Sequence, residues 1–213
     1  MLRYLDQEGM VHRDIKPENI LFDSNFNIKM SDFGLSRDAK GKNGDFMLYS
    51  RVGTEGYRSP EMEEGKYNGL QSDMFAIGVV LFVMYSGYPP FMGTRYHDRI
   101  YKLIREKNFT KFWEKHEKGK PEGFYDTSFK RLINSFLSAD PERRPTFDSL
   151  EDDEWWNDGK MSETEIKAEV KSKADVMFED SPIAEIKKKL FKEKIEEKET
   201  QEESDEEECT RSC

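Results

Sequence analysis

Cysteine is almost absent from this sequence of 213 residues. The two cysteines, Cys209 and Cys213, lie close to the C-terminus, so no disulfide can cross-link the rest of the chain. A body without cysteine is typical of proteins that fold in the reducing cytosol. A prenylation signal would need cysteine at the fourth position from the end, where this chain has Thr210, so that signal is excluded.

An excess of positive charge is also missing, since the formal net charge is −10 and the isoelectric point is about 5.0. Nucleic-acid binding needs lysine and arginine clustered on a basic face, so no nucleic-acid partner is expected. Residues 1–6 contain no apolar run that would indicate a secretory signal. The longest apolar run, residues 74–85, is shorter than the ~20 residues that span a bilayer and predicts a buried helix. We therefore expect a soluble, intracellular, cytoplasmic protein with no membrane partner.

Aromatic and charged residues are unevenly distributed along the chain. Residues 1–157 hold most of the aromatic side chains, enough for a hydrophobic core, whereas residues 158–213 are dominated by charge. This predicts one folded domain, 1–157, followed by a charged tail that is partly helical or disordered. In the tail, Ser162 and Glu165 form a capping-box pattern, and Ser181-Pro182 is a second candidate helix start.

The folded part is predicted to be mainly α with a small β-hairpin. Apolar residues on both sides of the turn at Asp23–Asn25 indicate the hairpin. Helices are expected at residues 1–7, from a cap at Ser72 or Asp73 to Tyr85, at 95–107, at 129–137, and from a cap at Thr146 to about 156. His97 and His116 stand among charged residues and are expected at the surface.

The segment His12-Arg13-Asp14-Ile15-Lys16-Pro17-Glu18-Asn19 places a carboxylate five residues before an amide, with a lysine between them. A solvated surface loop could hold the same residue types, but all eight positions resemble the catalytic loop of serine/threonine protein kinases. The resemblance implies that Asp14 orients the acceptor hydroxyl and accepts its proton. It also implies that Lys16 balances charge on the transferring phosphoryl group and that Asn19 holds magnesium.

A second segment, Ser31-Asp32-Phe33-Gly34, resembles the magnesium-binding motif of the same family. By this resemblance Asp32 holds the magnesium that bridges the ATP phosphates, Phe33 packs to set active or inactive states, and Gly34 permits the turn. ATP and Mg²⁺ are therefore the expected cofactors, with Asn19 and Asp32 as metal ligands. The residues implied in cofactor binding are Lys16, Glu18, Asn19, Leu21 and Asp32.

The segment Gly53–Glu61 resembles the end of a kinase activation segment. The resemblance implies that Thr54 bonds Asp14 and Lys16 and favours serine or threonine acceptors on a protein substrate. Catalytic roles are thus implied for Asp14, Lys16, Asn19 and Thr54.

Structural roles are implied for His12 and Arg13, and for Glu61, Asp73 and Arg144 further along the chain. Glu61 would form a buried ion pair with Arg144, since an arginine and a carboxylate can bond through two parallel hydrogen bonds. Ser72–Gly78 resembles the start of the family's central helix, where Asp73 would accept hydrogen bonds from the backbone of the catalytic loop.

Ser50 is a candidate regulatory site, because it lies three residues before Gly53. In kinases of this pattern the arginine that precedes the catalytic aspartate, here Arg13, often pairs with a phosphate on the activation segment. Phosphorylation of Ser50 by an upstream kinase would then order the segment. An unmodified loop serine is the alternative.

The resemblance covers about residues 1–156 in family order, and the wider architecture is similar to the calcium/calmodulin-dependent kinase group. The sequence has no Gly-x-Gly-x-x-Gly loop and no Val-Ala-Ile-Lys strand. We therefore expect the C-terminal lobe of a protein kinase without the β-rich N-terminal lobe. The expected function is a serine/threonine kinase fragment that alone transfers phosphate very slowly or not at all. The alternative is a catalytically incompetent scaffold or docking module.

Overall fold

The structure is a computed structural model that describes residues 2–95, 97–159 and 161–179. Residue contacts divide the chain into two units, Met1–Lys160 and Met161–Cys213. In chain order the elements are α1 Leu2–Gln7, β1 Met10–Val11, the 3₁₀ turn η1 Pro17–Asn19, β2 Ile20–Phe22, β3 Ile28–Met30, η2 Phe33–Leu35, β4 Arg37–Asp38, η3 Glu55–Tyr57, α2 Pro60–Glu64, α3 Gly69–Ser86, α4 Arg99–Arg105, α5 Phe109–Glu117, α6 Thr127–Phe136, η4 Pro141–Arg143, α7 Phe147–Glu151, α8 Glu154–Asn157 and α9 Glu163–Glu179.

The predicted β-hairpin is present. Strands β2 and β3 pair antiparallel with Ile20 opposite Met30. The Asp23 carboxylate holds the turn by accepting the backbone N–H groups of Asn25 and Asn27 at 2.9 Å each. A second pair, β1 with β4, was not predicted, because strands of two residues are too short to show alternation.

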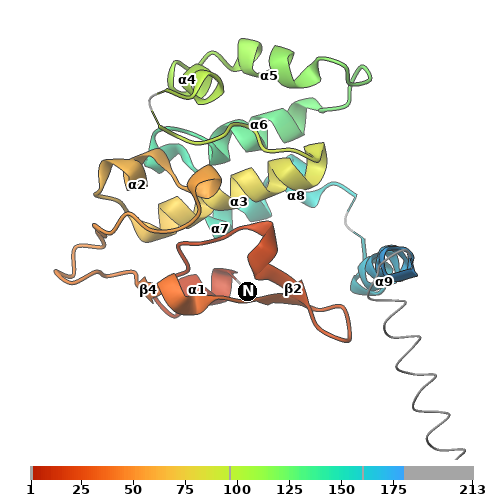
Figure 1. Ribbon diagram of the computed structural model, residues 1–213, viewed down its shortest axis with the longest axis horizontal. Helices are drawn as coiled ribbons and strands as arrows, with labels where there is room; N and C mark the ends of the chain where they lie inside the picture. Colours follow the sequence, from red (N-terminus) through yellow and green to blue (C-terminus); the bar gives the residue numbers. More distant parts are fainter. Residues whose placement is uncertain (1, 96, 160, 180–213) are drawn as a thin grey trace, which may run out of the picture. The chain divides into compact units, whose positions relative to one another are not determined.

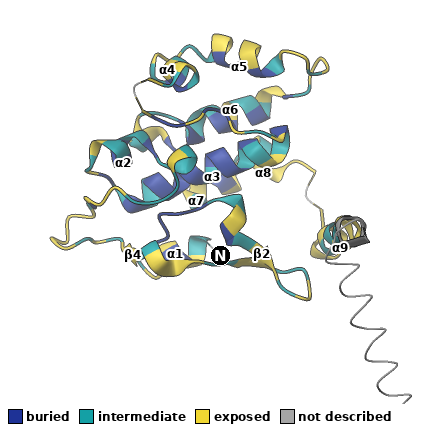
Figure 2. Cartoon of the chain, viewed as in Figure 1, coloured by how far each residue is buried: buried dark blue, intermediate teal, exposed yellow. Residues whose placement is uncertain are grey.

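Helix α3 is the central helix of the first unit, and it is buried along most of its length (Figures 1 and 2). It contacts α6, β1 and η3. Among the described residues, α3 is the one helix long and apolar enough to cross a membrane, but 61% of that 18-residue stretch is buried inside the protein. Such burial favours a core helix, as the sequence predicted for residues 74–85.

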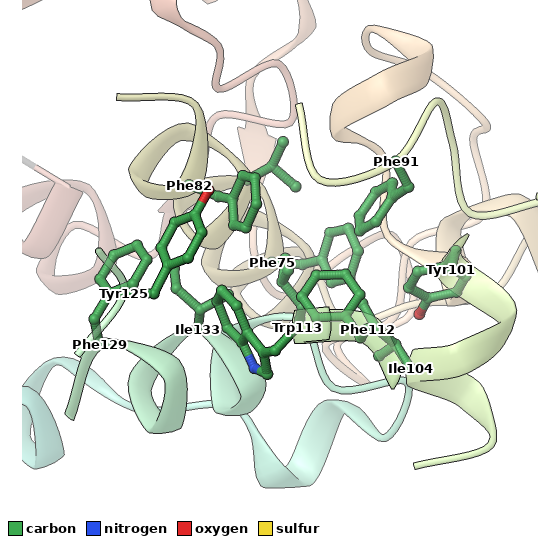
Figure 3. Close-up of a cluster of buried hydrophobic side chains, with 12 residues drawn as sticks. Phe75, Phe82, Phe91, Tyr101, Ile104, Phe112, Trp113, Tyr125, Phe129 and Ile133 are labelled. Carbon is green, nitrogen blue, oxygen red and sulfur yellow. The ribbon is translucent and has the colours of Figure 1, made fainter. Parts of the chain in front are cut away.

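Aromatic side chains from α3, α5, α6 and the intervening segments form the main core (Figure 3). The ring of Phe82 on α3 lies 6.0 Å from those of Trp113 and Tyr125. Tyr85, one turn further on, stacks on Phe129 with 4.1 Å between ring centroids. Such pairs contribute about 0.5–1.5 kcal/mol each beyond the area that they bury. The cluster therefore holds α5 and α6 against the C-terminal half of α3.

His116 belongs to this core, and the prediction that it lies at the surface was wrong. It is 7% exposed, and its ring lies 4.8 Å from Phe82 and 4.5 Å from Phe112. Burial lowers the pKa of His116 to about 4. Helix α5 was not predicted, although positions 109, 112, 113 and 116 have the i, i+3, i+4, i+7 spacing of an amphipathic helix, because the prediction for His116 rested only on its charged sequence neighbours.

Two helix starts also differ from the prediction. The cap of α3 is Asn68, whose side chain accepts a first-turn backbone N–H at 3.2 Å, whereas Ser72 and Asp73 are buried one turn inside the helix. Asp98 caps α4, which is shorter than the predicted 95–107. Thr146 caps α7 as predicted, but the stretch to residue 156 is divided into two short helices.

In the second unit the described residues form α9. The Ser162 hydroxyl accepts the Glu165 backbone N–H at 3.3 Å, and Glu165 Oε2 accepts the Ser162 backbone N–H at 2.8 Å. This is the predicted capping box. The second predicted tail helix, from Ser181, lies outside the described residues, as do Cys209 and Cys213.

Candidate active site

The loop His12–Asn19 is fixed by a carboxylate of α3. Asp73 accepts the backbone N–H of His12 at 2.6 Å and that of Arg13 at 2.8 Å. Arg13 has a φ of 68°, a left-handed conformation that costs a non-glycine residue on the order of 1 kcal/mol and needs such support. Burial raises the pKa of Asp73 to about 7, against the effect of the two hydrogen bonds. The contact implied by the family resemblance is therefore present.

Asp14, Lys16 and Thr54 meet at one point. Asp14 Oδ1 accepts the Thr54 hydroxyl at 2.7 Å and the Thr54 backbone N–H at 2.9 Å. Lys16 Nζ lies 2.9 Å from Asp14 Oδ2 and donates to Thr54 Oγ1 at 2.8 Å. Burial alone would raise the pKa of Asp14, but the hydrogen bonds from Lys16 and Thr54 outweigh it and lower that pKa. The hydrogen bond to Asp14 raises the pKa of Lys16, so both groups are charged at neutral pH.

Asn19 lies against the same carboxylate. Its Nδ2 donates to the Asp14 carbonyl at 2.8 Å and to Asp14 Oδ2 at 3.3 Å. Because the planar amide uses its nitrogen here, its oxygen points away from Asp14 and can serve as a ligand. The Ser31 backbone N–H donates to the Asn19 carbonyl at 3.0 Å, which anchors the segment that contains Asp32 beside this loop.

His12 connects the loop with the segment that carries Asp32. Its Nε2 lies 3.1 Å from the Ser31 carbonyl oxygen, and its ring meets Phe33 edge-on with 5.1 Å between centroids. Asp32 has a φ of 60° and accepts the Gly34 backbone N–H at 3.4 Å. A Cβ at Gly34 would lie 3.2 Å from Asp32 Oδ1, so the turn favours glycine. Asp32, Phe33 and Gly34 are all exposed.

Asn19 and Asp32 are the residues that could hold a magnesium ion. The charges of Asp14, Glu18 and Asp32 all raise the pKa of Lys16, so these groups share one electrostatic neighbourhood. The described residues include no group of three or more His, Cys, Asp or Glu side chains suited to a metal. Mg²⁺ bound together with nucleotide phosphates needs only one or two protein carboxylates, and an amide oxygen beside a carboxylate fits that mode.

Glu61 and Arg144 form the predicted buried ion pair. Arg144 Nη1 and Nη2 lie 2.5 and 2.7 Å from the two carboxylate oxygens of Glu61. Arg144 also donates to the carbonyls of Ser138 and Gln71 and lies 5.0 Å above the ring of Phe75. The pair fixes the start of α2, and with it the segment that presents Thr54 to Asp14.

Ser50 is exposed and lies near Arg13. Arg13 Nη1 donates to the Tyr67 hydroxyl at 3.3 Å, and that hydroxyl donates to the Ser50 carbonyl at 2.9 Å. Arg13, Arg37, Lys42 and Ser50 line one cavity of about 310 Å³. Tyr67 is completely buried, but its burial could not be predicted from the sequence, because it is a lone aromatic residue between polar residues.

The side of the site that carries Leu21 is open. Leu21 on β2 is 49% exposed and Phe33 is 46% exposed, and Glu18 in η1 also faces solvent. The apolar side chains exposed on the β elements and turns of this region are Met10, Leu21, Phe22, Ile28 and Phe33. Leu21, Glu18 and Asp32 thus lie on a partly apolar surface, whereas Asp14 and Asn19 are buried.

Similarity to known proteins covers most of the chain. Residues 1–156 match the family model of the protein kinase domain. The chain belongs to the protein kinase family. Kinases similar to it include CBL-interacting protein kinase 2 of Oryza sativa subsp. japonica, which is 35% identical over 157 residues (73% of this chain and 33% of that protein). CBL-interacting serine/threonine-protein kinase 2 of Arabidopsis thaliana is 36% identical over 157 residues (73% and 32%).

A third similar kinase, CBL-interacting protein kinase 33 of Oryza sativa subsp. japonica, is 36% identical over 184 residues, which is 84% of this chain and 37% of that protein. The chain therefore spans about a third of the length of the curated kinases that it matches. The described part is mainly helical with two small two-stranded sheets, which confirms the predicted mainly α composition with a small hairpin and adds the second sheet.

Proposed function

We propose that this chain provides the acceptor-binding and metal-binding residues of a serine/threonine protein kinase, which transfers the γ-phosphoryl group of ATP to a protein hydroxyl. The convergence of Asp14, Lys16 and Thr54, with Asn19 against the same carboxylate, is the observation that carries the proposal. A solvated surface loop would not bury Asp14 and Asn19 to 6% exposure each.

Each residue has a role that follows from its contacts. The Asp14 carboxylate accepts a hydrogen bond from the substrate hydroxyl and takes its proton as the hydroxyl oxygen bonds to phosphorus. Because the pKa of Asp14 is lowered, its main contribution is orientation, and the proton moves late in the transfer. The Lys16 ammonium stabilises negative charge on the transferring group.

Asn19 and Asp32 would hold Mg²⁺ through their oxygens, and Mg²⁺ neutralises phosphate charge when it is bound. Thr54 ties Asp14 to Lys16 through its hydroxyl, which supports serine or threonine as the acceptor.

We propose further that the 213 residues alone transfer phosphate very slowly or not at all. The support is the exposure of Leu21 and Phe33, since a nucleotide held against one open surface loses little of its contact with water. A scaffold or docking role is the alternative for the isolated chain.

Transfer of labelled phosphate from ATP tests both proposals. The natural protein in its full length should label serine and threonine peptides but not the matching tyrosine peptide. The purified 213-residue chain should label none of them above background. Full-length protein that binds ATP but labels no hydroxyl would refute kinase activity, and robust labelling by the 213 residues would refute the second proposal.

Ser50 is proposed as a phosphorylation site for an upstream kinase. Arg13, Arg37 and Lys42 line the cavity that Ser50 borders, and Asp38 is the one acidic residue among its lining residues. A phosphate on Ser50 would add about two negative charges opposite three positive ones, which would order the segment between β4 and Gly53.

A further inference from the structure

Three arginines surround one carboxylate close to Thr54. Glu63 on α2 lies 2.8 Å from Arg51 Nη2, 2.8 Å from Arg58 Nε and 3.5 Å from Arg95 Nε. The side chain of Glu63 is only 8% exposed, whereas those of Arg51 and Arg95 are each 51% exposed. We call Arg51, Arg58 and Arg95 the arginine cluster.

The positive charge of the arginine cluster exceeds the negative charge that it contacts. Among the residues that the structure describes, the carboxylates within 4 Å are Glu63 and Glu55, and Glu55 lies 3.4 Å from Arg95. Three guanidinium groups and two carboxylates leave a net charge of +1. Each guanidinium has five N–H donors, and a carboxylate accepts about four hydrogen bonds, so donors exceed acceptors. In the described part of the chain the buried Nε of Arg58 makes no aligned hydrogen bond, although it lies 2.8 Å from Glu63.

The arginine cluster lies close to the point where the acceptor hydroxyl meets Asp14. Thr54, which bonds Asp14, begins the 3₁₀ turn η3, and Arg58 ends it. A 3₁₀ turn rises about 2 Å per residue, so the backbone of Arg58 lies roughly 8 Å from that of Thr54. An extended peptide advances about 3.3 Å per residue. A substrate side chain about two residues from the acceptor would therefore reach the cluster.

The backbone that carries the arginine cluster is held rigidly. The Arg58 carbonyl accepts the Thr94 hydroxyl at 3.0 Å, and the neighbouring Glu61 is fixed by its ion pair with Arg144. The guanidinium groups are thus positioned before any ligand arrives, which reduces the entropy that binding must overcome.

We propose that the arginine cluster binds an acidic side chain of the protein substrate, a carboxylate or a phosphate, within about two residues of the acceptor. This inference rests on the proposed kinase function and specifies its substrate class. A guanidinium can bond a carboxylate or a phosphate through two parallel hydrogen bonds. A lysine or arginine at the same substrate position would be repelled, and that repulsion adds to the discrimination.

One neighbouring feature favours a different ligand. Met92 is 79% exposed, and a Cβ at Gly56 would meet nothing closer than the Met92 carbonyl oxygen at 3.8 Å, an ordinary van der Waals contact. An apolar substrate side chain could occupy this space, so the experiment includes a leucine peptide.

Peptide binding to the purified 213-residue chain tests the inference without phosphate transfer. Labelled peptides carry alanine in place of the acceptor, with glutamate, phosphoserine, leucine or lysine at each of the two positions on either side. Fluorescence anisotropy gives the dissociation constants. We expect the better acidic peptide to bind about tenfold more tightly than the lysine peptide, because partly exposed ion pairs each contribute modestly. The ratio of the glutamate and phosphoserine constants identifies which acid the cluster binds.

Charge reversal identifies the residues responsible. Arg51→Glu combined with Arg95→Glu should abolish or reverse the preference, and both sites tolerate substitution because they are half exposed. Arg131→Glu is the matched control, since Arg131 is 56% exposed and also contacts two carboxylates, Asp153 and Glu154. The Arg131→Glu variant should prefer acidic over lysine peptides to the same extent as the wild type. Circular dichroism melting verifies that all variants fold.

Several outcomes would overturn the inference. These are equal binding of acidic and lysine peptides, tightest binding of the leucine peptide, an acidic preference that survives the double reversal, or no binding of any peptide. Failure of the kinase function is detected separately. In that case the full-length protein would transfer no phosphate to the same peptides with serine restored, whatever their binding constants.

Discussion

The two halves of α3 share the apolar core but differ in what else they hold. In the N-terminal half, Ser72 bonds the hydroxyl of Ser59 at 2.8 Å, and Asp73 accepts two backbone N–H groups of the catalytic loop. In the C-terminal half, Phe82 and Tyr85 pack against aromatic rings. Phe75 in the N-terminal half also belongs to the aromatic core, so that half both packs in the core and holds the catalytic loop.

This difference predicts how the two halves respond to mutation. Hydrogen bonds and ion pairs depend on direction and lose their effect with a small displacement, whereas apolar packing is non-directional and scales with buried area. Substitutions among the polar contacts of the catalytic loop should therefore reduce activity more than stability. Substitutions in the aromatic cluster should do the reverse.

The largest effect is expected for Asp14→Asn. The amide cannot accept the acceptor proton, so kcat/KM of the full-length kinase should fall by about 10²–10⁴. The thermal midpoint should fall much less than the activity, because asparagine keeps the shape of the side chain, although its NH2 group then faces hydrogen-bond donors of Thr54 or of Lys16 and Asn19. Steady-state transfer to a serine peptide and circular dichroism melting measure the two quantities.

Asp6→Asn, an exposed position on α1, is the control and should leave both quantities unchanged. A fall of less than about tenfold for Asp14→Asn would contradict its role as proton acceptor, since general bases contribute at least about 10².

The next largest effect is expected at the buried ion pair. Arg144→Met leaves the Glu61 carboxylate buried without its partner and should lower the free energy of unfolding by about 3–5 kcal/mol. Adding Glu61→Met removes the unpaired charge and should restore part of that loss. Urea denaturation measures both. Equal destabilisation of the single and double variants would show that the pair contributes only through the packing of Arg144 on Phe75.

The contacts of the active site were predictable because they lie within contiguous motifs. The spacing of Asp14 and Asn19, and the motifs around Thr54, Glu61, Asp73 and Arg144, identified the family and with it the partners that these residues have in the structure. The hairpin was predictable from alternation and a turn, which are local properties.

The failures concern residues whose environment is set by tertiary contacts. His116 is buried because four aromatic rings lie around it, although two of its sequence neighbours are charged. Glu63 stands in a run with Glu61 and Glu64, so composition does not reveal that it would face three arginines. Strands β1 and β4 have two residues each and depend on each other to form.

In the aromatic cluster, His116 should make the free energy of unfolding depend on pH, and this effect is smaller than the two above. The pKa of His116 is lowered to about 4, so the unfolded chain binds the proton more tightly. Its contribution to stability is fully present above pH ~6.5 and is lost as the pH falls toward 4, about 2 kcal/mol of it between pH 7.5 and 5. The raised pKa of Asp73 acts in the opposite direction, because that contribution is lost as the pH rises through about 7.

The measurement is therefore the difference between wild type and His116→Phe in the free energy of unfolding at pH 7.5 and pH 5. Phenylalanine fits the aromatic surroundings and cannot titrate, so the variant should be relatively more stable at pH 5. Thr110→Phe, at an exposed position of the same helix, is the control and should show no such difference, because threonine does not titrate. A wild-type stability that changes with pH in parallel with His116→Phe would show that His116 is not titrating.

The smallest effect is expected at Ser50. It tests whether the polar contacts of the catalytic loop are also used for regulation. Ser50→Ala should lower the activity of full-length kinase isolated in its phosphorylated form by about fivefold, because Arg13 would lose a charged partner that orders the segment. Ser24→Ala, in the exposed hairpin turn, is the matched control. Arg37→Ala should lower activity in the wild type but not in Ser50→Ala, since Arg37 lines the same cavity and would act only through the phosphate. Unchanged activity of Ser50→Ala would remove the switch while leaving the catalytic contacts of Asp14 in place.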